Sequence, residues 1–226
     1  MQVVILAGGL GTRLRPLTFE IAKSMAPVNG RPFLEHQIKY LKQQGMKKIL
    51  LCVGYLSEQV VEYFNDGKKF GVEIQYSVER EPLGTGGALK NAEGKIGEEF
   101  ILVNGDTYLP LDYKRLLDFW KQKKKNVIVA YNNAEKIVGN NMFVKGGKVL
   151  AYSKNSSIGM NSVDAGVYVF NRDVLSFIPK NKKVSLETEI FSKLIEQKQL
   201  AGYVTSQRFY DMGTPERLKK MEEILK

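Results

Sequence analysis

The chain has 226 residues, 43% of them hydrophobic and 26% charged, so it is long enough to bury the core of one large α/β domain. It contains no apolar run of about 18 residues, so we expect no membrane-spanning helix. The net charge of +10 favours anionic partners, but the basic runs at 121–125 and 180–183 lack interleaved aromatic residues for base stacking. No nucleic-acid-binding module is recognisable, so we expect neither nucleic acid nor a membrane as a partner.

The start of the chain and its cysteine content are typical of a cytoplasmic protein. The first residues form an apolar run without a basic leader, as in a core strand and not a signal peptide. Cys52 is the only cysteine, so no internal disulfide can form. Because it lies in an apolar run, its thiol is expected to be buried and unreactive.

Apolar periodicity predicts alternating strands and helices up to residue 131. The expected strands are 3–7, 48–53, 72–78, 100–103 and 127–131, and the expected helices are 33–44, 57–64, 86–93 and 111–123. Ser57 is the expected cap of the second helix. This alternation indicates a mostly parallel sheet with helices on both faces.

The pattern changes after about residue 140 and becomes rich in strands. We expect strands at 142–144, 148–153 and 163–170, and helices at 188–197 and 214–225. No linker, internal repeat or low-complexity tract interrupts the chain. We therefore predict a single domain, 1–226, in which a β-rich part packs on the first part with a cleft between the two.

The most informative segment is the glycine-rich turn after the first strand, LAGGLGTRL at residues 6–14. Such a turn lets backbone N–H groups approach a phosphate without interference from a Cβ. The dinucleotide motif G-x-G-x-x-G fails because Leu14 stands at its third glycine, and the P-loop motif G-x-x-x-x-G-K-[ST] is absent. From these residues alone, a phosphate-binding turn and a purely structural turn both stay open.

Two basic residues near the turn are candidates for phosphate contacts. Arg13 offers a planar fork to phosphate oxygens. Lys23 lies in a segment with Pro16, Pro27 and Pro32, which favour an ordered loop over a helix. Lys23 could reach a second phosphate. The alternative is that Lys23 is an ordinary loop lysine that contacts only solvent.

The segment at residues 6–18, L-A-G-G-x-G-T-R-L-x-P-L-T, resembles the signature of the sugar-1-phosphate nucleotidyltransferases. Further resemblances follow in order over essentially the whole chain: Lys23 with Pro27-Val28, EPLGTGGAL at 81–89, NGD at 104–106, VDAGVY at 163–168, SLE at 185–187 and YDMGTP at 210–215. Ala22 and Ser24 depart from the prolines usual around the lysine, and Asp164 stands where asparagine is commoner. Because the sequence stops at Lys226, we expect no C-terminal β-helix and no acyltransferase activity.

The resemblance implies an α/β fold that is Rossmann-like (GT-A-type), with a mixed, mainly parallel sheet flanked by helices and a β-rich sugar-binding lobe. Residues up to about 135 would form the nucleotide-binding lobe and residues from about 136 to 226 the sugar-binding lobe. The implied reaction joins a nucleoside triphosphate to a sugar 1-phosphate and releases pyrophosphate. It would serve nucleotide-sugar biosynthesis, such as that for lipopolysaccharide or capsule, and a homodimer is left open.

The resemblance also implies roles for particular residues. The catalytic residues would be Arg13, Lys23 and Asp106, and Mg²⁺ would be held by Asp106 and Asp211, since this cation prefers carboxylate oxygens. The sugar phosphate would contact Gly139, Lys154, Asp164 and Glu187. The nucleotide would contact Leu6, Ala7, Gly8, Gly9, Gly11, Thr12, Arg13, Glu79, Pro82, Gly84, Thr85 and Gly105.

Base specificity is expected to depend on the residue five places before Gly84. Relatives that use uracil or thymine carry a glutamine there, whereas this chain has Glu79, with Glu81 as the alternative if the alignment slips by two. A carboxylate only accepts hydrogen bonds, and guanine offers two adjacent donors, so the pairing favours GTP.

The chain most resembles short guanylyltransferases that act on mannose or manno-heptose 1-phosphate. A uridylyltransferase acting on an amino-sugar 1-phosphate is the first alternative. A catalytically silent regulatory paralogue is the second, although it would be expected to lack Arg13, Lys23 or a metal aspartate.

Overall fold

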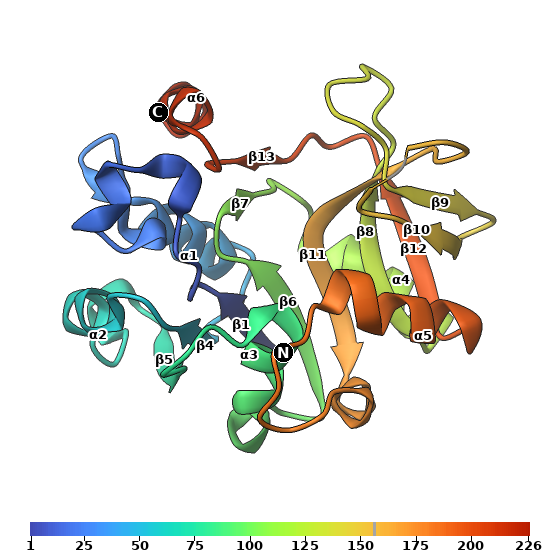
Figure 1. Cartoon of the computed structure of the whole chain (residues 1–226), viewed down its shortest axis with the longest axis horizontal. Coiled ribbons are helices and arrows are strands. Elements are labelled where there is room, and N and C mark those ends of the chain that lie inside the picture. Colours follow the sequence, from blue (N-terminus) through green and yellow to red (C-terminus); the bar gives the residue numbers. More distant parts are fainter. Residues whose placement is uncertain (156) are drawn as a thin grey trace.

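A nine-stranded sheet runs through the centre of the molecule (Figure 1). The computed structural model describes residues 1–155 and 157–226. Strands β11 and β10 run opposite to the others, so the sheet is mixed and mainly parallel, as predicted. In spatial order the strands are β5 (Glu73–Val78), β4 (Lys48–Val53), β1 (Gln2–Leu6), β6 (Glu99–Asn104), β11 (Val163–Asn171), β8 (Asn126–Tyr131), β12 (Leu200–Thr205), β10 (Lys148–Tyr152) and β9 (Met142–Lys145).

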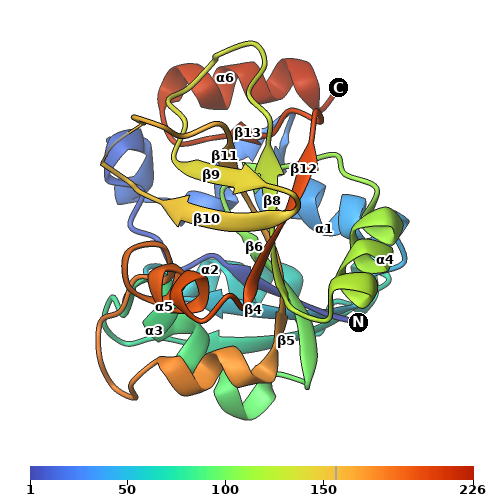
Figure 2. The same ribbon diagram turned by 90° about the vertical axis from the view of Figure 1, so that its right-hand side faces the viewer.

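Helices cover both faces of this sheet, with α4 and α5 on opposite sides in Figure 2. One face packs against α1 (Phe33–Gln43), α2 (Ser57–Phe64) and α4 (Tyr113–Lys123), and the other against α3 (Gly84–Asn91) and α5 (Phe191–Glu196). Successive residues of each strand point to alternate faces, so Val3 and Ile5 join the first core and Val4 the second. Strands that are buried on both faces need apolar residues throughout, so their sequences are continuous apolar runs.

We predicted that the C-terminal part of the chain packs on the first part. The structure shows instead that its strands belong to the same sheet. Strand β11 lies between β6 and β8, so residues from the second half occupy the middle of the sheet. Strand β12, which pairs in parallel with β8, was not predicted because its sequence LAGYVT shows neither alternation nor a continuous apolar run. At Gly202, a Cβ would lie 2.7 Å from a methyl carbon of Val144, so this glycine is needed for packing.

Two smaller differences concern helix starts. Ser57 does not cap α2. Leu56 occupies the N-cap position with φ 53°, and no side-chain hydrogen bond caps this end of the helix. The helix predicted at 188–197 begins as a π-helical turn, Leu186–Ile190, which α5 continues.

Short paired strands bring the C-terminal segment beside the middle of the chain. Strand β7 (Thr107–Tyr108) pairs antiparallel with β13 (Tyr210–Asp211), and β2 (Pro27–Val28) pairs with β3 (Arg31–Pro32). Helix α6 (Pro215–Ile224) packs near them through a small apolar cluster of Ala26, Val28, Phe33, Met212 and Met221. In the described part of the chain, no helix is both long and apolar enough to span a membrane.

Candidate active site

The glycine-rich turn and the Asn104–Asp106 turn lie side by side because they follow adjacent parallel strands. In the β1–β6 pair, Leu6 stands opposite Asn104, and the Gly105 N–H donates to the Leu6 carbonyl at 2.9 Å. A Cβ at Gly105 would lie 2.5 Å from that carbonyl oxygen, so a larger residue would push the two turns apart. The turns leave the carboxyl ends of the strands near the point where strand order reverses, the usual ligand-binding edge of such sheets.

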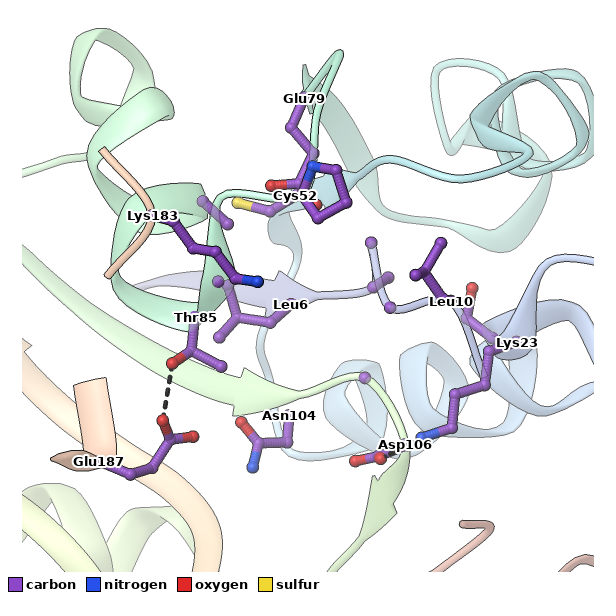
Figure 3. A pocket seen from close by; sticks show the side chains of 18 residues that line it. Leu6, Leu10, Lys23, Cys52, Glu79, Thr85, Asn104, Asp106, Lys183 and Glu187 are labelled. Carbon is purple, nitrogen blue, oxygen red and sulfur yellow. Dashed lines mark hydrogen bonds and ion pairs between the residues drawn. The ribbon is translucent and has the colours of Figure 1, made fainter. Parts of the chain in front are cut away.

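A cavity of about 340 Å³ opens at this edge (Figure 3). Of the residues predicted for the site, it is lined by Leu6, Ala7, Gly8, Gly9, Lys23, Glu79, Pro82, Gly84, Thr85, Gly105, Asp106 and Glu187. It is also lined by residues that were not among those predicted for the site: Leu10, Ser24, Cys52, Ala88, Asn104 and Lys183. Gly11, Thr12, Arg13, Gly139, Lys154, Asp164 and Asp211 are not among its lining residues.

Lys23 and Asp106 form an ion pair at one end of the cavity, with the lysine amine donating to Asp106 Oδ2. Lys23 is therefore not a free, solvated loop lysine. Gly11, with φ 64°, makes room for it, because a Cβ there would lie 3.1 Å from Lys23 Cβ. Buried Gln37 of α1 donates to the carbonyls of Asn104 at 3.0 Å and Thr107 at 2.7 Å, and thereby holds the turn that carries Asp106.

Asp211 approaches the same turn from the C-terminal segment. It stands opposite Thr107 in the β13–β7 pair, and the Met212 N–H donates to the Asp106 carbonyl at 3.1 Å. Its carboxylate accepts two hydrogen bonds from Arg217 Nη1, at 2.9 and 2.7 Å, and lines a separate cavity of about 280 Å³. The backbones of the two predicted metal ligands are thus joined, while their shared metal site stays a prediction.

Arg13 lies beside this C-terminal segment and not in the cavity wall. A Cβ at Gly213 would lie 3.0 Å from Arg13 Nη2 and 2.8 Å from Asp211 Oδ1. Glycine at 213 therefore leaves room for both the exposed guanidinium of Arg13 and the Asp211 carboxylate.

Glu187 lies at the opposite end of the cavity from the Lys23–Asp106 pair (Figure 3). Its Oε2 accepts from Thr85 Oγ1 at 2.8 Å and Ser185 Oγ at 2.6 Å, and Lys154 Nζ lies 3.6 Å away. Burial would raise its pKa, but these hydrogen bonds and the lysine outweigh burial and lower the pKa below its usual value. Glu187 is therefore ionised at neutral pH.

Asp164 lies outside the cavity wall, against two tyrosines. Its Oδ2 accepts from the hydroxyls of Tyr152 at 3.0 Å and Tyr168 at 2.9 Å, and its Oδ1 accepts from the Gly166 N–H at 2.9 Å. Burial raises its pKa to about 6, although these hydrogen bonds oppose the shift. Asp164 therefore carries its charge at neutral pH only at a cost in folding free energy.

This pKa predicts how the stability of Asp164→Asn depends on pH. The folded state binds the Asp164 proton more tightly than the unfolded state, so the wild type loses stability as pH rises from about 4 to about 6. The asparagine variant does not suffer this loss, so its free energy of unfolding should gain about 1–2 kcal/mol relative to the wild type between pH 4.5 and 7.5.

Urea unfolding at the two pH values measures this difference. Asp173→Asn, the same change at an exposed aspartate, is the matched control and should not show it. Parallel pH profiles for Asp164→Asn and the wild type would contradict the assignment.

Glu79 folds over the start of the glycine-rich turn. A Cβ at Gly8 would lie 2.6 Å from Glu79 Oε1, so Gly8 makes room for this carboxylate, whereas at Gly9 nothing lies within 4 Å. Glu79 Oε2 accepts from the Leu83 N–H at 3.2 Å. Burial raises the Glu79 pKa and that hydrogen bond partly opposes it, while burial raises the pKa of neighbouring Cys52 to about 12. The Cys52 thiol is buried, as predicted, and its raised pKa keeps it protonated at neutral pH.

The second glycine-rich segment owes its glycines to protein packing. A Cβ at Gly84 would lie 2.6 Å from the Val184 carbonyl oxygen, and one at Gly87 would lie 2.6 Å from that of Lys182. The chain at 182–184 lies along the first turn of α3, with the Val184 N–H donating to the Leu83 carbonyl and the Gly86 N–H donating to the Val184 carbonyl, both at 2.9 Å. These glycines therefore hold a distant segment of the chain against the edge of the cavity.

The chain matches the nucleotidyl transferase family over residues 2–226. It is 32% identical to a D-glycero-α-D-manno-heptose 1-phosphate guanylyltransferase of Aneurinibacillus thermoaerophilus, over 100% of this chain and 98% of that protein. It is 35% identical to a mannose-1-phosphate guanylyltransferase of Mycobacterium tuberculosis, over 96% of this chain but 62% of that protein. A solved structure of HddC from Yersinia pseudotuberculosis complexed with GMP-PN shares 30% identity and a TM-score of 0.83, over 100% of this chain and 99% of that one. The fold, the cavity and these matches agree with the resemblance seen in the sequence, and the chain belongs to the nucleotidyl transferase family of enzymes.

Proposed function

We propose that the protein condenses GTP with a manno-configured sugar 1-phosphate, giving a GDP-sugar and pyrophosphate. One observation carries this proposal: a single cavity joins the glycine-rich turn, the Lys23–Asp106 pair and Glu187. Relatives named as guanylyltransferases of manno-heptose and mannose 1-phosphate support the choice of base and sugar.

In the proposed reaction, an oxygen of the sugar phosphate attacks the α-phosphorus of GTP, and the bond to the β-phosphate breaks. Both substrates are polyanions, so the protein must neutralise charge and align the reacting groups. Lys23 would contact phosphate oxygens at the reacting centre, and Arg13 would stabilise the triphosphate and the leaving pyrophosphate. The backbone N–H groups around Gly9, where no protein atom lies within 4 Å of a Cβ position, would approach the phosphates.

Asp106 and Asp211 fit a divalent cation. Both are carboxylates on backbone segments that pair with one another, and Mg²⁺ typically uses one or two carboxylates together with waters and phosphate oxygens. In this structure each carboxylate is paired with a cation, Lys23 or Arg217. When bound there, Mg²⁺ would supply positive charge against the phosphate oxygens.

The sugar would lie toward residues 136–226 and the nucleotide toward residues 1–135. The Glu187 carboxylate would accept a hydrogen bond from a sugar hydroxyl, while Lys154, Asp164 and Gly139 would act from outside the cavity wall. Such an enzyme would work in the cytoplasm, where nucleotide sugars are assembled.

Glu79 provides a test of base choice. Glu79→Gln exchanges one acceptor oxygen for a donor, so it should lower kcat/KM for GTP about 10–100-fold and improve UTP relative to GTP. Glu81→Gln is the matched control, because Glu81 does not line the cavity. If Glu81→Gln changes base preference and Glu79→Gln does not, the alignment on Glu79 is wrong.

The function itself is tested by pyrophosphate release. The protein is incubated with each nucleoside triphosphate, Mg²⁺ and a panel of sugar 1-phosphates, and we expect release with GTP and mannose or manno-heptose 1-phosphate. Turnover of UTP with amino-sugar 1-phosphates would instead identify a uridylyltransferase. Silence over the whole panel, with sugar-nucleotide binding retained, would identify a regulatory paralogue.

A further inference from the structure

Lys183 is a cation in the cavity wall that makes none of the side-chain contacts described above. The cavity is lined by two lysines and three carboxylates, of which Lys23 and Asp106 pair with each other. Among the residues that the structure describes, the Lys183 ammonium group has no hydrogen-bond or ion-pair partner, and it is exposed within the open cavity. An unpaired charge directed into a substrate cavity is available to a ligand.

The backbone around Lys183 is held in place although its side chain is free. Its neighbour Val184 is buried and exchanges hydrogen bonds with the first turn of α3, and the Lys182 carbonyl lies against Gly87. Lys183 therefore projects from a fixed segment, and its position in the cavity does not depend on a mobile loop.

Figure 3 shows Lys183 reaching into the cavity on the side of Glu79 and Thr85, away from Lys23 and Asp106. The apolar residues that line the cavity include Leu6, Cys52, Pro82 and Ala88, and Figure 3 shows Leu6 and Cys52 near Lys183. Apolar walls suit the faces of a purine ring, and charged groups at the edge of such a site select its hydrogen-bonding pattern. Among the charged groups on this side, the Glu79 carboxylate accepts hydrogen bonds and the Lys183 ammonium group donates them, while Glu187 is already bonded to Thr85.

The donor and acceptor character of these two groups matches that of one edge of guanine. Guanine offers two adjacent donors, N1–H and the 2-amino group, followed by the acceptor O6. We propose that Lys183 donates to guanine O6 while Glu79 accepts from the two donors, so that Lys183 is a specificity-determining residue of the cavity. This inference rests on the proposed use of GTP.

The test compares GTP with 6-thio-GTP, which keeps both donors but replaces O6 by sulfur, a weaker acceptor. Binding is measured by calorimetry without sugar phosphate, and kcat/KM is measured by pyrophosphate release. Lys183→Met should weaken GTP binding and kcat/KM by about 10–50-fold but change 6-thio-GTP by less than about 3-fold. Lys183→Arg should restore most of the GTP affinity, and 7-deaza-GTP, which lacks only N7, should behave like GTP.

Lys182→Met is the matched control, because Lys182 is the exposed neighbour that does not line the cavity, and it should leave both nucleotides unaffected. Equal losses for GTP and 6-thio-GTP, no loss at all, or a raised KM for the sugar 1-phosphate with nucleotide binding unchanged would each overturn the role of Lys183. A wild-type protein that binds UTP and not GTP would instead overturn the proposed function, whatever the variant does.

Discussion

Asp106→Asn is expected to lower kcat by about 10²–10³-fold while the protein folds normally. The change removes the negative charge that pairs with Lys23 and one of the two carboxylates proposed to hold the metal ion. The fold should tolerate it, because the Asp106 side chain is 32% exposed and partly exposed ion pairs contribute little to stability. The turn itself is held by Gln37, which bonds to backbone carbonyls and not to the carboxylate.

Steady-state kinetics and urea unfolding, measured on the same preparation, separate the two effects. Asp118→Asn makes the same chemical change at an exposed position on α4 and should match the wild type in both. Full activity in Asp106→Asn would remove this residue from the metal site, and a large loss of stability would make its role structural.

Several strands could be predicted from the sequence, because a strand that is buried on both faces must consist of apolar residues. The apolar runs at β1, β4, β6 and β8 were recognisable for this reason. Strand β12 was missed because it carries Gly202 for close packing against Val144, a requirement that only the neighbouring strands impose. The insertion of β11 between β6 and β8 is likewise a property of the pairing, since nothing in the order of elements along the chain distinguishes it from an added layer.

Much of the predicted site came together because its motifs follow adjacent strands. The positions of Gly105 and Asp106 beside the glycine-rich turn follow from the parallel pairing of β1 with β6. The individual glycines were harder to interpret. Gly8 makes room for Glu79 and Gly84 for Val184, whereas Gly9 faces open space. A glycine motif alone does not distinguish a residue that admits a phosphate from one that admits the protein's own chain.

Three residues of the site or its surroundings were not revealed by the sequence: Gln37, Lys183 and Arg217. Gln37 is a polar residue among the apolar positions of α1, a signal that could have marked it as a buried support. Lys183 belongs to the basic run at 180–183, in which nothing separates the lysine that lines the cavity from its solvated neighbours. Arg217 pairs with Asp211 from the next helix, a contact that depends on how α6 leaves β13.

Lys23→Met is the second change expected to have a large effect, lowering kcat by about 10²–10³-fold. The lysine is 15% exposed and lies between Asp106 and the space where phosphates would bind, so methionine removes the positive charge but keeps the length of the side chain. Lys23→Arg should rescue little, because a planar guanidinium presents its donors in a different geometry from the compact lysine ammonium group.

If Lys23 and Asp106 act as one unit, their effects on catalysis should not add. The double variant Lys23→Met with Asp106→Asn should be slower than the worse single variant by less than about 10-fold, whereas independent contributions would multiply to about 10⁴-fold or more. The double-mutant cycle is measured from kcat at saturating substrate, with Asp118→Asn combined with Lys23→Met as the additive reference. Losses that multiply would show that Lys23 and Asp106 act independently in catalysis. Their ion pair would then make no contribution to kcat.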